Sequence, residues 1–157
     1  MGATVSVSRE IAAPPEVVWA MISDVTRMGE WSPETTGCRW IKGATGPVVG
    51  ARFAGDNRNG SKKWSTNCTV TAAEPGRSFV FRVDVGPLKV AQWGYALEPA
   101  GAGCIVTETW TDRRGGLVQA LGKPLSGVAD RAEHNRAGME QTLARLAAAA
   151  EGAGAGG

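Results

Sequence analysis

Apolar and polar residues alternate in short runs along most of the chain. Residues 3–11, ATVSVSREI, form the first such run and predict a β-strand. Further runs typical of strands lie within GCRWIKG, GARFAG, KWSTNCTVTAAE, SFVFRVDV, KVAQWGYALEP and GCIVTETWTD. Short turns such as residues 74–77, Glu-Pro-Gly-Arg, join consecutive runs. This succession of hairpins predicts an antiparallel sheet.

Three other segments are helical. Pro14 and Pro15 set the first turn of a helix that carries several apolar residues on one face. Asp24 can cap a second, short helix that ends near Gly29. A long C-terminal helix is predicted by a stripe at helical spacing, which comprises Val128, Ala132, Asn135, Met139, Leu143, Leu146 and Ala150.

The order of these elements predicts an α+β fold. The long C-terminal helix is the one amphipathic element able to cover the apolar face of the sheet. We therefore expect a curved antiparallel sheet of about seven strands around that helix, with the two short helices after the first strand closing one end. Residues 1–150 are expected to form a single domain, and the Gly/Ala-rich residues 151–157 a disordered tail.

Composition and charge argue against several classes of function. The 157 residues carry a net charge of +2 with both signs interspersed, which provides no basic face for nucleic acid. Lys62 and Lys63, with Arg58 nearby, are interpreted as a solvated hairpin end. No apolar run approaches the ~20 residues needed to span a bilayer, and the N-terminal residues lack the features of a signal peptide.

The cysteine and histidine content argues against metal binding. The chain has an odd number of cysteines, and they lie far apart in the sequence: Cys38, Cys68 and Cys104. This pattern is typical of reduced thiols in a cytoplasmic protein. His134 is the only histidine, and it lies well away from the apolar stripe of its helix, so we expect it to be exposed. We therefore expect no metal and no cofactor. Motifs for nucleophilic catalysis and phosphate-cradling loops are also missing.

Alternation within the strands predicts which side chains share the concave face. The larger apolar set of each strand should point inward. The resulting wall comprises Trp64, Cys68, Phe79, Phe81, Trp93, Tyr95, Val106 and Trp110, closed by Met139 and Leu143 from the helix. Such a surface suits an apolar, ring-containing ligand, or the same side chains fill the interior and leave no void.

Two polar residues fall on this apolar surface. If Val106 and Trp110 face inward, Glu108 does too, and there it must be hydrogen-bonded, paired or protonated. It would then serve, with Tyr95, as a proton-shifting group or as an anchor for a ligand hydroxyl. The alternative is that Glu108 has the opposite phase or pairs with an arginine. Asn135 on the helix is either a ligand contact or a helix-to-sheet hydrogen bond.

Six stretches together resemble a known superfamily: IAAPPEVVWAMISDVTRMGEWSP, VGARFAG, EPGRSFVFRV, WGYALEP, GCIVTETW and NRAGMEQTLARL. The chain resembles the START-like, or Bet v 1-like (SRPBCC), superfamily over residues 3 to about 150. Within it, the chain is similar to the bacterial polyketide cyclase/dehydrase and lipid-transport group. The resemblance implies the helix-grip fold, with a deep cavity between the sheet and the long helix.

The resemblance also implies where the cavity opens and what it holds. The short helices and the segment after them would lie at its mouth, so Trp31 is either a rim residue or a core residue. Trp40 is expected in the core.

The first hypothesis for function is a cytoplasmic protein that binds a small hydrophobic molecule, such as a lipid, isoprenoid or polyketide. The second is a polyketide cyclase or dehydratase that uses Glu108, and the third is a protein-interaction module. Monomer and homodimer both remain open.

Overall fold

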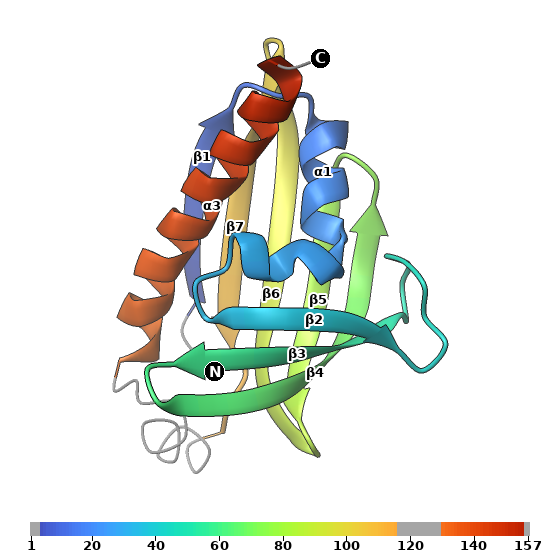
Figure 1. Cartoon of the computed structure of the whole chain (residues 1–157), viewed down its shortest axis with the longest axis vertical. Coiled ribbons are helices and arrows are strands. Elements are labelled where there is room, and N and C mark those ends of the chain that lie inside the picture. The colour runs from blue at the N-terminus through green and yellow to red at the C-terminus, as the bar shows by residue number, and fades with distance from the viewer. Residues whose placement is uncertain (1–3, 116–129, 156–157) are drawn as a thin grey trace.

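A computed structural model describes residues 4–115 and 130–155, whose elements are drawn in Figure 1. A single seven-stranded antiparallel sheet has the strand order β1-β7-β6-β5-β4-β3-β2. The elements are β1 (Thr4–Ile11), α1 (Pro15–Ser23), the 3-10 helix η1 (Val25–Glu30), β2 (Thr35–Ile41), β3 (Arg52–Asn59), β4 (Lys62–Glu74), β5 (Ser78–Val85), β6 (Leu88–Ala100), β7 (Gly103–Asp112) and α3 (Arg131–Ala155). The predicted helix-grip architecture is confirmed, with β1 paired to the last strand, β7.

Local sequence explains where the two short helices begin. Pro15 occupies the first turn of α1, where a missing backbone N–H costs nothing, and Glu16 is the acidic residue of that turn. The side chain of Asp24 accepts a hydrogen bond from Thr26 N at 3.2 Å and so starts η1, as its position in the sequence predicts. α1 is attached to the sheet through Trp19, whose Nε1 donates to Ser78 O at 2.8 Å.

Curvature allows the sheet to wrap around α3. Register shifts interrupt the pairing of β4 with β5 near Val70 and of β5 with β6 near Val83. Such bulges bend and twist a strand pair. The sheet therefore curls, and Figure 1 shows β2, β3 and β4 crossing in front of the lower part of β5 and β6.

The helices cover only part of the concave face. α3 packs on β1 and β7, whereas α1 packs on β5, β6 and β7. In Figure 1 α1 lies over the upper half of these strands, on the same side as α3. α1 therefore covers only the upper part of these strands.

The described part of α3 follows the predicted stripe, with Asn135, Met139, Leu143, Leu146 and Ala150 all buried. Val128, the first predicted member, lies outside the described residues. The helix continues to Ala155, into the segment that was expected to be disordered. Alanine-rich sequence favours helix, and Glu151 in this segment accepts a hydrogen bond from Ala12 N at 3.0 Å. None of the helices in these two ranges is long and apolar enough to cross a membrane.

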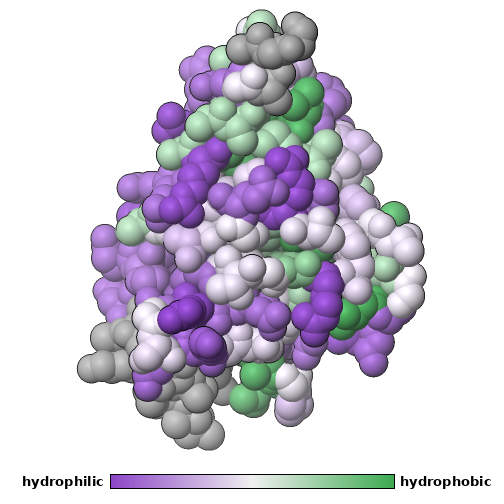
Figure 2. All heavy atoms as spheres, viewed as in Figure 1, coloured by the Kyte–Doolittle hydropathy of each residue, from purple (hydrophilic) through white to green (hydrophobic). Residues whose placement is uncertain are grey.

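Figure 2 shows a largely polar and mixed face of the molecule. Its hydrophobic side chains gather in part at the side where the β2–β3 connection lies in Figure 1. Val48 and Val49 of that connection are exposed. Scattered apolar side chains of this kind are normal on protein surfaces, so they do not by themselves mark a binding site.

Candidate functional site

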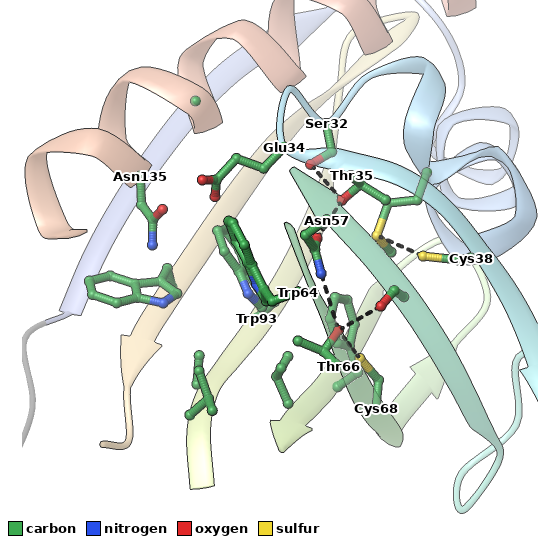
Figure 3. A pocket seen from close by; sticks show the side chains of 18 of the residues that line it. Ser32, Glu34, Thr35, Cys38, Asn57, Trp64, Thr66, Cys68, Trp93 and Asn135 are labelled. Carbon is green, nitrogen blue, oxygen red and sulfur yellow. Dashed lines mark hydrogen bonds between the residues drawn. The ribbon is translucent and has the colours of Figure 1, made fainter. Parts of the chain in front are cut away.

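A pocket of about 330 Å³ lies between the curled sheet and the first half of α3. Its lining comes from the segment 32–35, from β2 to β7 and from α3, and Figure 3 shows part of it. Val85 and Leu88, at the β5–β6 turn, line the pocket and are 40% and 45% exposed. The pocket therefore opens toward the turns at the lower end of the sheet and closes toward α1.

The floor of the pocket is aromatic. Phe81, Trp93 and Trp110 are successive cross-strand partners on β5, β6 and β7, so their side chains stand in one row on the concave face. Phe53 from β3 packs edge-on against Phe81, with ring centroids 5.1 Å apart. These rings provide a rigid apolar surface of the kind that binds flat hydrophobic molecules.

At its closed end the pocket contains a buried polar pair. Tyr95 and Glu108 are direct cross-strand partners on β6 and β7, and Tyr95 OH donates to Glu108 Oε2 at 2.9 Å. Glu108 is 2% exposed and lines the pocket. Its second oxygen, Oε1, is buried and has no hydrogen-bond partner among the described residues. A carboxyl group thus borders the pocket with one oxygen hydrogen-bonded and the other buried without a partner among the described residues.

Burial controls the charge of this pair. Desolvation raises the pKa of Glu108 to about 8, although the hydrogen bond from Tyr95 acts in the opposite direction. Burial also raises the pKa of Tyr95 well above its ordinary value, helped by the neighbouring carboxyl group. At neutral pH, Glu108 is therefore mainly a neutral carboxylic acid and Tyr95 a neutral phenol.

The open end of the pocket carries charged groups. Glu34, just before β2, accepts a hydrogen bond from Arg131 Nη1 at 2.6 Å, and its other oxygen lies 3.2 Å from His134 Nε2. Arg131 also donates to Asn135 Oδ1 at 3.3 Å and lies over the ring of Trp64, 5.8 Å from its centroid. These contacts connect the segment 32–35 to the first turns of α3 across the mouth. We call Glu34, Arg131 and His134 the mouth cluster.

Most of the side chains predicted for the pocket do line it. They are Trp64, Cys68, Phe81, Trp93, Tyr95, Glu108, Trp110, Asn135 and Met139. Of the two phases left open for Glu108, the structure has the inward one, and the partner of Glu108 is a tyrosine rather than an arginine. The contact that Asn135 makes is with Arg131 of its own helix, and not with the sheet.

Three other predicted residues are fully buried outside the pocket: Phe79, Val106 and Leu143. Alternation assigns Phe79 and Val106 to the correct face, but it does not indicate how far the pocket extends along each strand. Trp19 of α1 binds the backbone of Ser78, next to Phe79. α1 thus fills the concave face at this level, and these side chains form core there.

The structure places Trp31 in the core rather than at the rim. It is 3% exposed and does not line the pocket. The backbone N–H of Trp31 donates a hydrogen bond to Met28 O at the end of η1, and the backbone carbonyl of Trp31 accepts one from Arg145. The guanidinium of Arg27 lies 4.9 Å from the centroid of the Trp31 ring. The residues that reach the mouth follow directly, from Ser32 to Thr35. Trp40 is partly buried against Phe53, as expected for a core residue.

Several lining residues were missed from the sequence. Phe53 and Gly55 alternate in GARFAG, so the period of the strand was sufficient to find them. Glu34 and Arg131 had no such signal because their approach depends on tertiary structure. His134 was expected to be exposed, yet it lines the mouth with its side chain 37% exposed. Arg131 and His134 lie beside the apolar stripe of the helix, and both line the pocket.

One wall of the pocket carries thiols and small polar groups. Cys38 Sγ lies 3.8 Å from Met28 Sδ, and Thr66 lies beside Cys68 (Figure 3). All three cysteines are free thiols, and burial raises the pKa of Cys38 to about 11 and that of Cys68 to about 12. Within the two described ranges, no cluster of three or more His, Cys, Asp or Glu side chains has the arrangement of a metal site.

The chain belongs to the family described as polyketide cyclase / dehydrase and lipid transport, whose model matches residues 2–151. The polyketide-cyclase-like protein Cgl2372 from Corynebacterium glutamicum is 35% identical, with a TM-score of 0.62. That match covers 94% of this chain and 90% of the other. The search of curated proteins gave no match.

More distant structures share the fold. The di-domain ARO/CYC StfQ from the steffimycin biosynthetic pathway has a TM-score of 0.75 at 14% identity, over 97% of this chain and 52% of that one. The protein Ara h 8.0201 has a TM-score of 0.70 at 11% identity, over 97% of this chain and 99% of that one. Both identities are low, so these two likenesses support the architecture alone.

Proposed function

We propose that the protein binds a small hydrophobic molecule, such as a lipid, isoprenoid or polyketide, in the pocket between the sheet and α3. The observation that carries the proposal is the pocket itself, about 330 Å³ in volume with an aromatic floor. Pockets for small molecules have volumes of about 300–1,000 Å³ and combine an apolar lining with a few polar groups. Membership of the polyketide cyclase / dehydrase and lipid transport family supports the same reading. The three free thiols fit a reducing compartment such as the cytoplasm.

Native mass spectrometry of the protein as purified tests the proposal first, with solvent extraction to identify any bound compound. A second measurement uses phenylnaphthylamine, a neutral dye whose fluorescence rises in apolar surroundings. We expect the wild-type protein to bind one dye molecule and to release it when a natural ligand is added.

A matched pair of variants on α3 shows whether the pocket is responsible. Met139 lines the pocket, whereas Leu143, one turn further along the same helix, is buried outside it. Met139→Trp should fill the pocket and abolish dye binding, and Leu143→Met should leave it unchanged. Circular dichroism establishes that both variants are folded. Equal binding by the two variants would mean that the dye binds elsewhere, and the proposal would then be wrong.

Catalysis is a second candidate function, favoured by the Tyr95–Glu108 pair. A neutral carboxylic acid in an apolar pocket, hydrogen-bonded to a phenol at 2.9 Å, is suited to general acid-base chemistry. The family name includes cyclases and dehydrases, whose reactions require proton transfer to or from carbon and oxygen. In this reading the pocket orients a reactive substrate, and the carboxylate form of Glu108, which is populated near its pKa of about 8, takes up a proton from carbon and returns it.

Proton exchange separates binding from catalysis. In D₂O, the methyl protons of methyl naphthyl ketone exchange slowly because their removal forms an enolate. If Glu108 shifts protons, the wild-type protein accelerates this exchange and Glu108→Gln does not, although both bind the ketone. Binding without acceleration in either protein would favour the non-catalytic function.

A further inference from the structure

We propose that the closed end of the pocket recognises a carbonyl oxygen of the ligand, with the carboxylic acid of Glu108 as the hydrogen-bond donor. This inference rests on the proposed binding function and specifies its ligand chemistry. The ligand would place a ketone, ester or quinone oxygen at the closed end and its apolar body over the aromatic floor.

The geometry of Glu108 supports this assignment. One of its oxygens, Oε2, accepts from Tyr95 OH at 2.9 Å, so the hydroxyl hydrogen of a neutral acid resides on Oε1. Oε1 is buried without a partner among the described residues, and Glu108 is among the residues that line the pocket. A buried donor without an acceptor is costly, and a carbonyl oxygen in the pocket supplies the acceptor.

The surroundings of Glu108 keep it in the donating form. Tyr95 is the titratable group in contact with it in the described part of the chain, and Val7 is its cross-strand neighbour on β1. The neutral residues that α3 contributes to the pocket are Asn135, Gly138, Met139 and Thr142. The charged or titratable side chains among the other lining residues are Glu34, Cys38, Lys63, Cys68, Arg114, Arg131 and His134. Burial has a larger effect on the pKa of Glu108 than the hydrogen bond from Tyr95, so its carboxyl group stays protonated until about pH 8.

Three naphthalene derivatives of similar shape test the inference. Methyl naphthyl ketone carries the acceptor, isopropenylnaphthalene replaces C=O by C=CH₂, and naphthylethanol carries a donor hydroxyl. Their affinities are measured by displacement of phenylnaphthylamine at about pH 6 and about pH 10, on either side of the Glu108 transition.

We expect the wild-type protein at the lower pH to bind the ketone about tenfold more tightly than the alkene, since one hydrogen bond to a buried group is gained. At the higher pH this preference should disappear because a carboxylate has no proton to donate. Glu108→Gln should keep the preference at both pH values, since its amide donates without titrating. It also controls for effects of pH elsewhere in the protein. The double variant Tyr95→Phe with Glu108→Leu leaves no orphaned hydroxyl and should bind ketone and alkene equally.

Infrared spectroscopy adds a direct readout of the contact. The C=O stretch of the bound ketone should move to lower frequency in the wild-type protein and in Glu108→Gln, but not in the double variant.

Several results would overturn the inference. Equal binding of ketone and alkene by the wild-type protein at the lower pH would exclude a carbonyl contact at Glu108. A preference for naphthylethanol that increases with pH would mean that the site accepts a hydroxyl donor instead. In both cases the naphthalenes bind, so the proposed binding function survives. If none of the three compounds, nor the dye, binds the folded protein, the binding function fails and the carbonyl assignment fails with it.

Discussion

Replacing Glu108 by glutamine should change how the stability of the protein depends on pH. Glutamine has nearly the same shape and can still accept from Tyr95, but it cannot ionise. Burial raises the pKa of Glu108 from 4.5 in the unfolded chain to about 8 in the folded protein, a difference of about 3.5 pH units. At about 1.4 kcal/mol per unit, this corresponds to at most about 5 kcal/mol of unfolding free energy.

The sign follows from proton binding. Below about pH 4.5, Glu108 is protonated in both states and its contribution to stability does not vary. Between about pH 4.5 and about pH 8, the folded state holds a proton that the unfolded state has lost, so the wild-type protein loses stability as the pH rises. Glu108→Gln should therefore gain on the wild-type protein by about 1.4 kcal/mol per pH unit across this window, and the gain should level off above it.

Urea unfolding, followed by far-ultraviolet circular dichroism, measures this difference from about pH 4 to about pH 9. All other titrating groups are common to the two proteins and cancel in the difference. Glu108→Leu serves as a second neutral variant, and its curve should run parallel to that of Glu108→Gln with an offset for the lost hydrogen bond. A difference between wild type and Glu108→Gln that does not vary with pH would refute the reasoning, because Glu108 would then not be desolvated.

Three further predictions concern the packing and the mouth of the pocket. Gly103→Ala should destabilise the protein by more than about 3 kcal/mol, because a Cβ at this position would lie 2.3 Å from Ile11 O. Gly37→Ala is the control, and it should change the stability little because a Cβ there would meet nothing within 4 Å. Trp31→Ala should lower the unfolding free energy by about 3–5 kcal/mol while leaving dye affinity unchanged in the folded fraction, since Trp31 is core. Glu34→Ala removes the anion of the mouth cluster, so stopped-flow measurements should show faster dye entry and faster release with little change in affinity.

Each of these outcomes has a result that would contradict it. Similar unfolding midpoints in urea for Gly103→Ala and Gly37→Ala would mean that β1 and β7 separate easily at that point. A Trp31→Ala protein that is fully stable but exchanges dye faster would mean that Trp31 lies at the rim of the pocket and not in the core. Glu30→Ala, which removes an exposed ion pair with Arg27, is the control for Glu34→Ala. Equal dye kinetics in these two variants would show that the mouth cluster does not hinder entry.

Local patterns in the sequence specify the elements and their order. Period-two alternation, the turn residues between the runs, and the proline and aspartate at the starts of the short helices are local signals. The inward phase of Glu108 also followed from alternation, because Val106 and Trp110 on the same strand are large and apolar. Its cross-strand pairing with Tyr95 required the register of β6 and β7, which alternation within one strand does not specify.

The tertiary structure decided where the pocket ends and what closes its mouth. Phe79 and Trp93 both belong to the predicted apolar face, yet α1 packs over one end of that face, and only Trp93 lines the pocket. The contact between Glu34 and Arg131 joins residues 97 positions apart. Neither property is encoded in a local pattern, because each depends on how far the sheet curls and where each helix lies on it. The sequence thus determined which residues face inward, and the packing of α1 and α3 determined which of them border open space.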